Sequence, residues 1–195
     1  MKIKKSDINF FLSLFLFAHL IIWTLVPSIS NTNLPLDTIE ALTWSNELQL
    51  GYDKYPPIFP LFTELFYLIF GNQDWAYYFL SQLFVVSGFV IIFKFSEDFF
   101  QNKALSLISI LLLEGIYFYN FTTPELNAFL CQLPFLAATV FYCWKAIKIN
   151  DNISWFLFGF FSALAVLTYY LSFYLLSSLG LFFIYIIIKK KKFNY

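Results

Sequence analysis

The chain has 195 residues, of which 60% are hydrophobic and 12% are charged, and its mean hydropathy is +0.71. Soluble domains carry about 25% charged residues, so this much apolar surface cannot be buried in one 23.0 kDa globule. Most of the chain must therefore lie in lipid. Lysines and carboxylates balance to no net charge, and together with the hydropathy this excludes a nucleic-acid-binding protein and a soluble enzyme.

The N-terminal region predicts an uncleaved first membrane helix. Three lysines lie within residues 1–5, and an apolar run follows from Ile8 to Val26. This run of about 19 residues is long enough to span a bilayer. No small-x-small cleavage motif follows it, which argues against a signal peptide.

A polar, turn-rich segment, residues 28–57, comes next. Within it, Leu36–Leu50 predicts a short helix, because Pro35 suits a first helical turn and Gly51 suits a C-terminal cap. The following apolar segment, Ile58–Phe70, is too short to cross the hydrocarbon layer. It predicts a helix that lies at the membrane interface.

The remaining apolar stretches predict further crossings: Trp75–Phe95, Ala104–Tyr119, Leu126–Ile147 and Trp155–Ile188. The last would be about 50 Å long as one helix, so it should fold into a hairpin near Thr168–Ser172. Ala104–Tyr119 and each arm of the hairpin are short for a span. The expected fold is all-α: one membrane domain, residues 1–195, with about six transmembrane helices and with interfacial helices in a first outer loop, residues 28–74.

The lysines orient this topology. With the N-terminus inside, six crossings put every lysine except Lys54 on the cytoplasmic side, as the positive-inside rule requires. If Ile58–Phe70 crossed the membrane, all lysines from Lys94 onward would move outside. If Trp155–Ile188 were a single span, the cluster Lys189–Lys192 would emerge outside. Both ends of the chain are therefore expected in the cytoplasm.

The first outer loop contains the candidate chemistry. Asp37, Glu40, Trp44 and Glu47 share one face of the predicted helix, which is typical either of a functional acidic pair or of the solvated face of a surface helix. Lys54 is the single outer lysine in this topology. It indicates either a bound anion or a contact with lipid headgroups.

Other ionisable and sulfur-containing side chains have more ordinary interpretations. Glu125 is expected in the first turn of a helix, where a carboxylate suits the helix dipole. Glu114, in the outer half of the third crossing, either snorkels to the interface or points at a partner, and His19 is expected to be a packed or hydrogen-bonded core histidine. Cys131 and Cys143 are too far apart on one helix for a disulfide. They predict buried thiols without metal-binding spacing.

Several motifs, in order, resemble one family of proteins. An acidic pair in residues 36–41 (LDTIEA) is followed by residues 51–57 (GYDKYPP) and by an apolar segment that closes with Phe70 and Gly71. The similarity continues in residues 124–127, 132–134 and 155–168. The chain resembles the N-terminal half of glycosyltransferase family 39 and the protein-mannosyltransferase-like group, which includes the bacterial aminoarabinose transferases of lipid A. In that group an acidic motif opens the first outer loop, and a Pro-Pro motif leads into an interfacial helix.

This resemblance implies a GT-C-like membrane glycosyltransferase of the bacterial cell envelope, in the inner membrane. It would move a sugar from a polyprenyl-phosphate carrier to a lipid or glycan acceptor on the outer face. Asp37 is implied as the base that takes the acceptor proton, with Glu40 supporting it or binding a divalent cation. Lys54 is implied to stabilise the leaving phosphate. The remaining candidates for substrate binding are Asp53, Tyr55 and Glu125.

Three departures from the family pattern leave alternatives open. Tyr55 stands where many members have His, and Tyr169 stands where many have a Lys that binds the donor phosphate. Members of the group also continue into further membrane helices, so a missing C-terminal half or a partner subunit is expected. The alternatives to an active enzyme are an inactive truncated remnant and a non-catalytic membrane subunit or transporter fragment.

Overall fold

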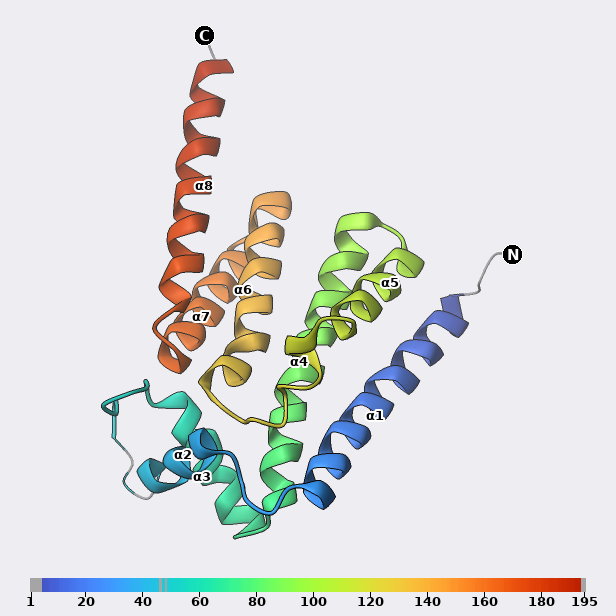
Figure 1. Ribbon diagram of the computed structural model, residues 1–195. Helices are drawn as coiled ribbons and strands as arrows, with labels where there is room; N and C mark the ends of the chain where they lie inside the picture. The colour runs from blue at the N-terminus through green and yellow to red at the C-terminus, as the bar shows by residue number, and fades with distance from the viewer. Residues whose placement is uncertain (1–4, 46, 48, 194–195) are drawn as a thin grey trace.

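The computed structural model describes residues 5–45, 47 and 49–193, and helices joined by turns make up this part of the chain (Figure 1). The elements, in chain order, are α1 (Lys5–Ser30), α2 (Leu36–Ser45), α3 (Ile58–Phe70), α4 (Asp74–Phe100), α5 (Lys103–Glu114), the 3-10 helix η1 (Tyr117–Tyr119), α6 (Ala128–Ile149), α7 (Asn152–Thr168) and α8 (Ser172–Phe193).

Successive helices cross the molecule in alternating directions (Figure 1). α1 leads to the end that carries α2 and α3, which we call the loop end. α4 returns to the opposite end, and α5, α6, α7 and α8 continue the alternation, so α8 finishes at the end where α1 begins. We call that opposite end the lysine end, because the ends of the helices there contain Lys94, Lys103, Lys145, Lys148 and Lys189.

Four of these helices are long and apolar enough to cross a membrane. Their candidate spans are Asp7–Ser30, Asp74–Phe100, Ala128–Ile149 and Ser172–Lys189. α5 and α7, with 12 and 17 residues, reach only about 18 Å and about 25 Å. The all-α polytopic fold is thus confirmed, but the expected six crossings become four long helices and two shorter passages within the described residues.

α1 and α8 expose most of their apolar side chains. Only 17% of the apolar window in α1 and 6% of that in α8 is buried within the molecule. A helix that is apolar around its circumference and unburied by protein needs lipid or another apolar surface around it. Both helices therefore support a position in the bilayer.

α5 ends five residues earlier than the sequence predicts. It begins with a capping bond, in which the Asn102 side chain accepts from the backbone N–H of Ala104. It stops at Glu114, whose carbonyl oxygen accepts a hydrogen bond from the Asn120 side chain. Because a side chain takes the place of the next helical N–H, the chain turns away after Gly115 and continues without a regular α-helix to residue 127.

The two loop helices follow the prediction in part. α3 has the predicted bounds, and Gly71 ends it with a φ of +64°, a conformation that glycine adopts without strain. α2 starts as predicted but ends at Ser45, so the cap expected at Gly51 is wrong. The Ser45 hydroxyl lies 3.0 Å from the Leu42 carbonyl and 2.9 Å from the Glu64 carboxylate of α3, and this tertiary contact lies at the point where the helix ends. Residues 46 and 48 lie outside the described residues.

The loop end is packed onto the bundle by a shared apolar core. Ala41 of α2, Tyr55 and Phe59 are buried against α4 and the start of α6. A hydrogen bond of 3.0 Å from the Thr38 hydroxyl to the Leu126 carbonyl joins α2 to the loop before α6. Both cysteines are buried on α6, as predicted. The described residues of α2, α3 and the turn before α3 are therefore a fixed part of the fold.

Thr38→Val is expected to lower the free energy of unfolding by about 1–3 kcal/mol, because the buried Leu126 carbonyl loses its partner. Thermal unfolding in detergent measures this change. Thr32→Val, at an exposed position, serves as the control and should change little. Equal stabilities of the two variants would contradict the role of this tether.

Candidate functional site

Lys54 lies between two carboxylates of α2 at the loop end. Its Nζ is 2.9 Å from Asp37 Oδ1 and 2.8 Å from Glu40 Oε2. Asp37 and Glu40 are one helical turn apart, so a single ammonium can reach both. The structure thus brings together three of the predicted site residues, which we call the Lys54 cluster (Asp37, Glu40 and Lys54).

The segment before α3 fixes the position of Lys54. The Tyr52 N–H donates to the Tyr55 carbonyl at 3.0 Å and closes a turn around Lys54. Tyr55 is buried beneath it, with 4% of its surface exposed. Pro56 and Pro57 restrict the backbone that leads into α3. This non-helical segment therefore presents Lys54 to α2 from a rigid support.

An aromatic floor lies under the cluster. Lys54 Nζ is 5.1 Å from the centre of the Tyr55 ring, a cation–π distance. The Tyr55 ring contacts those of Trp44 (5.7 Å), Phe59 (5.8 Å) and Tyr169 (5.8 Å). Tyr55 and Tyr169, the two tyrosines that depart from the family pattern, are therefore neighbours in space.

The cluster combines a permanent positive charge with loosely held partners. The hydrogen bond to Glu40, and to a smaller extent that to Asp37, raises the pKa of Lys54 above its ordinary value. The side chain therefore stays protonated at physiological pH. The side chain of Lys54 is 46% exposed, and those of Asp37 and Glu40 are 32% and 33% exposed. Exposed ion pairs contribute only about 0–1 kcal/mol, so an anionic ligand can compete for the ammonium at little cost.

Burial and the charge of Asp37 raise the pKa of Tyr55. Its phenol therefore stays neutral at physiological pH. Beside the Lys54 cluster, Tyr55 supplies a ring and a hydroxyl, and the carboxylates of Asp37 and Glu40 supply the negative charge.

Asp53 and Glu125 do not join this cluster. Asp53 is exposed and forms no ion pair in the part of the chain that is described. Glu125 is also exposed and lines a separate cavity with Trp23 and Asn31. Its predicted place in the first turn of a helix is wrong, because Asn127 caps α6, accepting from the Leu130 N–H at 3.1 Å, and Glu125 precedes that cap.

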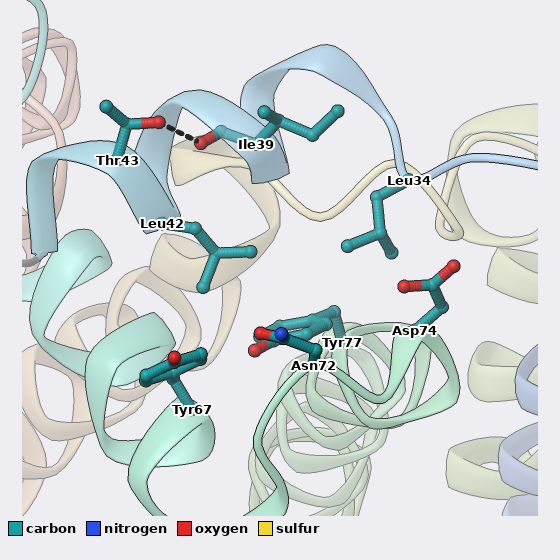
Figure 2. A pocket seen from close by; sticks show the side chains of 8 residues that line it. All are labelled: Leu34, Ile39, Leu42, Thr43, Tyr67, Asn72, Asp74 and Tyr77. Atoms are coloured by element: carbon teal, nitrogen blue, oxygen red, sulfur yellow. Dashed lines mark hydrogen bonds between the residues drawn. The ribbon is translucent and has the colours of Figure 1, made fainter.

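A second cavity lies on the other face of α2 (Figure 2). It has a volume of about 390 Å³ and lies between α2, α3 and the start of α4. Figure 2 shows side chains of α2 above it and Tyr67, Asn72 and Tyr77 below. Asp74 is the charged side chain in its lining, which makes the cavity unsuitable for a phosphate. The lining residues are Leu34, Ile39, Leu42, Thr43, Tyr67, Asn72, Asp74 and Tyr77.

A buried polar network between α1, α4 and α5 was not predicted as a unit. His19 Nδ1 lies 2.8 Å from Glu114 Oε2, and His19 Nε2 lies 3.1 Å from Gln82 Oε1. The prediction of a hydrogen-bonded core histidine is confirmed, and Glu114 points at a partner. The signal in the sequence was the presence of two ionisable side chains at membrane depth, since such groups need partners there.

The carboxylates of the Lys54 cluster supply two candidate ligands for a cation. Across the described residues, no group of three or more His, Cys, Asp or Glu side chains is arranged to hold a metal ion. The ammonium of Lys54 already lies between Asp37 and Glu40. A divalent cation bound at this pair would have to displace it.

The fold and the cluster define a polytopic membrane protein with an acidic and lysine-containing site at one end of its helices. The sequence profile of the family described as dolichyl-phosphate-mannose-protein mannosyltransferase matches residues 54–194. The chain belongs to this family, and membership indicates membrane glycosyltransferase activity. The match includes Lys54, Tyr55 and Glu125, whereas Asp37 and Glu40 precede it. No curated protein and no solved structure matches the chain significantly.

Proposed function

We propose that this protein transfers a sugar from a polyprenyl-phosphate donor to an acceptor hydroxyl at the loop end of its membrane helices. The observation that carries the proposal is the Lys54 ammonium held between Asp37 and Glu40. In this arrangement a cation that can bind a phosphate lies within hydrogen-bonding distance of a carboxylate that can act as a base. Family membership supports glycosyl transfer as the reaction.

Lys54 binds the donor phosphate in this proposal. An ammonium has three N–H donors, and the contacts with Asp37 and Glu40 use two of them. The third, which interacts with the Tyr55 side chain, can turn to a phosphate oxygen. Negative charge grows on the phosphate as its bond to the anomeric carbon breaks, and a positioned cation stabilises that charge most in the transition state.

Asp37 acts as the base. The acceptor oxygen forms a bond to the anomeric carbon, the bond from that carbon to the phosphate oxygen breaks, and polyprenyl phosphate leaves. The acceptor's hydroxyl proton passes to the Asp37 carboxylate. A shift of Lys54 toward the phosphate weakens its contact with Asp37, while Glu40 continues to hold the ammonium. Donor binding thereby prepares the base.

The surrounding residues position the two substrates. The Tyr55 ring supports Lys54 from below. We assign Asp53 and Glu125, both exposed at the loop end, to contacts with hydroxyl groups of the sugar or of a lipid or glycan acceptor. The prenyl chain of the donor lies among the apolar helices, because a water-soluble site cannot hold it.

We place the lysine end of the protein in the cytoplasm and the loop end outside, in a bacterial inner membrane. The described lysines support this orientation, because Lys54 alone among them lies at the loop end, and lysines concentrate on the cytoplasmic side. A membrane-impermeant thiol reagent added from outside should label Gln49→Cys and leave Lys94→Cys and Lys189→Cys unlabelled. Cys131 and Cys143 are buried and give little background. Labelling of Lys94→Cys from outside would show that the protein has the opposite orientation in the membrane.

Donor recognition can be tested without knowledge of the acceptor. Binding of radiolabelled polyprenyl-phosphate mannose to the protein in lipid nanodiscs should be displaced by polyprenyl phosphate but not by the uncharged polyprenol. This difference isolates the phosphate contact from the affinity of the prenyl chain for lipid. Equal displacement by both compounds, or no binding above that of empty nanodiscs, would reject the proposed donor.

A further inference from the structure

The network around His19 lies where α5 stops, midway through the bundle (Figure 1). His19 is buried, with 3% of its surface exposed, and its two ring nitrogens face Glu114 and Gln82 at 2.8 Å and 3.1 Å. Glu114 also accepts from the Trp23 indole at 3.4 Å. Both nitrogens of the imidazole therefore have oxygen partners.

The neighbouring Thr123 settles which hydrogen each group carries. The Thr123 hydroxyl donates to the Asn120 carbonyl at 2.6 Å, so toward Gln82 it can only accept. Gln82 Nε2 donates to it at 3.1 Å, which leaves Gln82 Oε1 facing the histidine. Since an amide oxygen only accepts, His19 Nε2 must be an N–H.

One further proton must lie between His19 and Glu114. His19 Nδ1 either carries a hydrogen and donates to a carboxylate, or accepts from a protonated Glu114. In both cases the pair holds one proton more than a neutral imidazole beside a carboxylate. The pair is then uncharged overall, as its position at membrane depth favours.

The chain that follows Glu114 depends on these bonds. Non-helical backbone at membrane depth is tolerated only where its polar groups are satisfied by protein or water. Here the Asn120 side chain donates to the Glu114 carbonyl, and the Ser81 hydroxyl donates to the Thr123 carbonyl. The network thus anchors residues 115–127 to α1 and α4.

We propose that His19 and Glu114, through their shared proton, are positioning residues that hold residues 115–127 in place at the loop end. This segment carries Glu125 and the Leu126 carbonyl, which accepts from Thr38, the neighbour of Asp37. The network is therefore linked to the Lys54 cluster by a short path of covalent and hydrogen bonds. The anchoring itself does not depend on the proposed function; its effect on sugar transfer does.

Few other polar or charged side chains surround the pair of His19 and Glu114. The imidazole is surrounded by the rings of Phe15 (6.3 Å) and Trp23 (6.5 Å) from α1 and of Phe89 (5.4 Å) from α4. The nearby phenol of Tyr119 belongs to a ring that packs on Phe89. Among the described residues, no lysine and no second carboxylate forms an ion pair with His19 or Glu114.

Hydrogen exchange of residues 115–127, measured in nanodiscs, tests the proposal. Glu114→Gln should stay protected throughout, because its amide N–H can donate to Nδ1 while its oxygen accepts from Trp23. His19→Phe, which keeps a ring but loses both bonds, should exchange at least about tenfold faster than the wild type, as expected for the loss of about one hydrogen bond or more.

Exchange in Glu114→Gln as rapid as in His19→Phe would overturn the proposal, as would full protection in His19→Phe. Sugar transfer gives a second readout, in which His19→Phe should lower the rate and Glu114→Gln should keep a rate close to that of the wild type. Because exchange needs no substrate, an expected exchange result with no sugar transfer would reject the proposed function and retain the anchoring role.

Discussion

Asp37→Asn is expected to lower the rate of sugar transfer by about 10²–10⁴-fold, the contribution of a positioned general base. The amide keeps the size and the oxygen that contacts Lys54, but it cannot take the acceptor proton. Donor binding should therefore remain within a few-fold of the wild type. The measurement is the initial rate of transfer in proteoliposomes at saturating donor, with donor affinity determined separately.

Glu47→Gln is the matched control for Asp37→Asn. The sequence places Glu47 on the same face of a longer helix, but α2 ends at Ser45 and Glu47 is exposed, forming no ion pair with Lys54 in the described part of the chain. Its substitution should leave the rate unchanged. Full activity of Asp37→Asn, or an equal loss in both variants, would remove Asp37 from the role of base.

Lys54→Met is expected to lower kcat/KM for the donor by about 10²–10³-fold, the typical effect of removing one group that stabilises developing negative charge. Methionine keeps the apolar stem over the Tyr55 ring but cannot neutralise a phosphate. The loss of the cation also leaves Asp37 and Glu40 facing each other one turn apart. Kinetics with varied polyprenyl-phosphate sugar measure the effect.

Lys54→Arg separates charge from geometry at the same position. The guanidinium keeps the positive charge and binds phosphate well, so the variant should recover a large part of the donor dependence that Lys54→Met loses. Glu40→Gln should have a smaller effect, because the amide oxygen of the glutamine can still accept from the ammonium. An unchanged kcat/KM in Lys54→Met would show that the phosphate binds elsewhere.

Local sequence signals predicted the elements whose ends depend on local chemistry. α3 has its predicted bounds because an apolar run is followed by a glycine that ends it. The turn between α7 and α8 also lies where the length of the apolar stretch required one. The early ends of α2 and α5 coincide instead with contacts to Glu64 of α3 and to Asn120, six residues beyond the end of α5, and the pattern of apolar residues does not contain such contacts.

The two carboxylates of the Lys54 cluster could be predicted from the sequence. The spacing of Asp37 and Glu40 puts both on one helical face, as the structure shows. Their direct contact with Lys54 depends on the turn closed by Tyr52 and Tyr55, which no spacing rule gave. The position of Glu125 depends on where Asn127 caps α6, and there the prediction failed.

The His19 network shows a different limit of sequence reasoning. Polarity at membrane depth correctly indicated that His19 and Glu114 need partners. Their pairing requires α1, α4 and α5 to pack together, which the order of apolar runs does not specify. Gln82, a neutral side chain inside a long apolar helix, completes the network and gave no separate signal.

The most direct test of the central claim is the formation of polyprenyl phosphate from a polyprenyl-phosphate sugar. The protein should be expressed in membranes that supply native acceptors, and the lipid and glycan products should be followed together by mass spectrometry. The account predicts that polyprenyl phosphate and a glycosylated acceptor increase together with the wild-type protein and not with Asp37→Asn. No increase with the wild type, or the same increase with Asp37→Asn, would contradict sugar transfer by the Lys54 cluster.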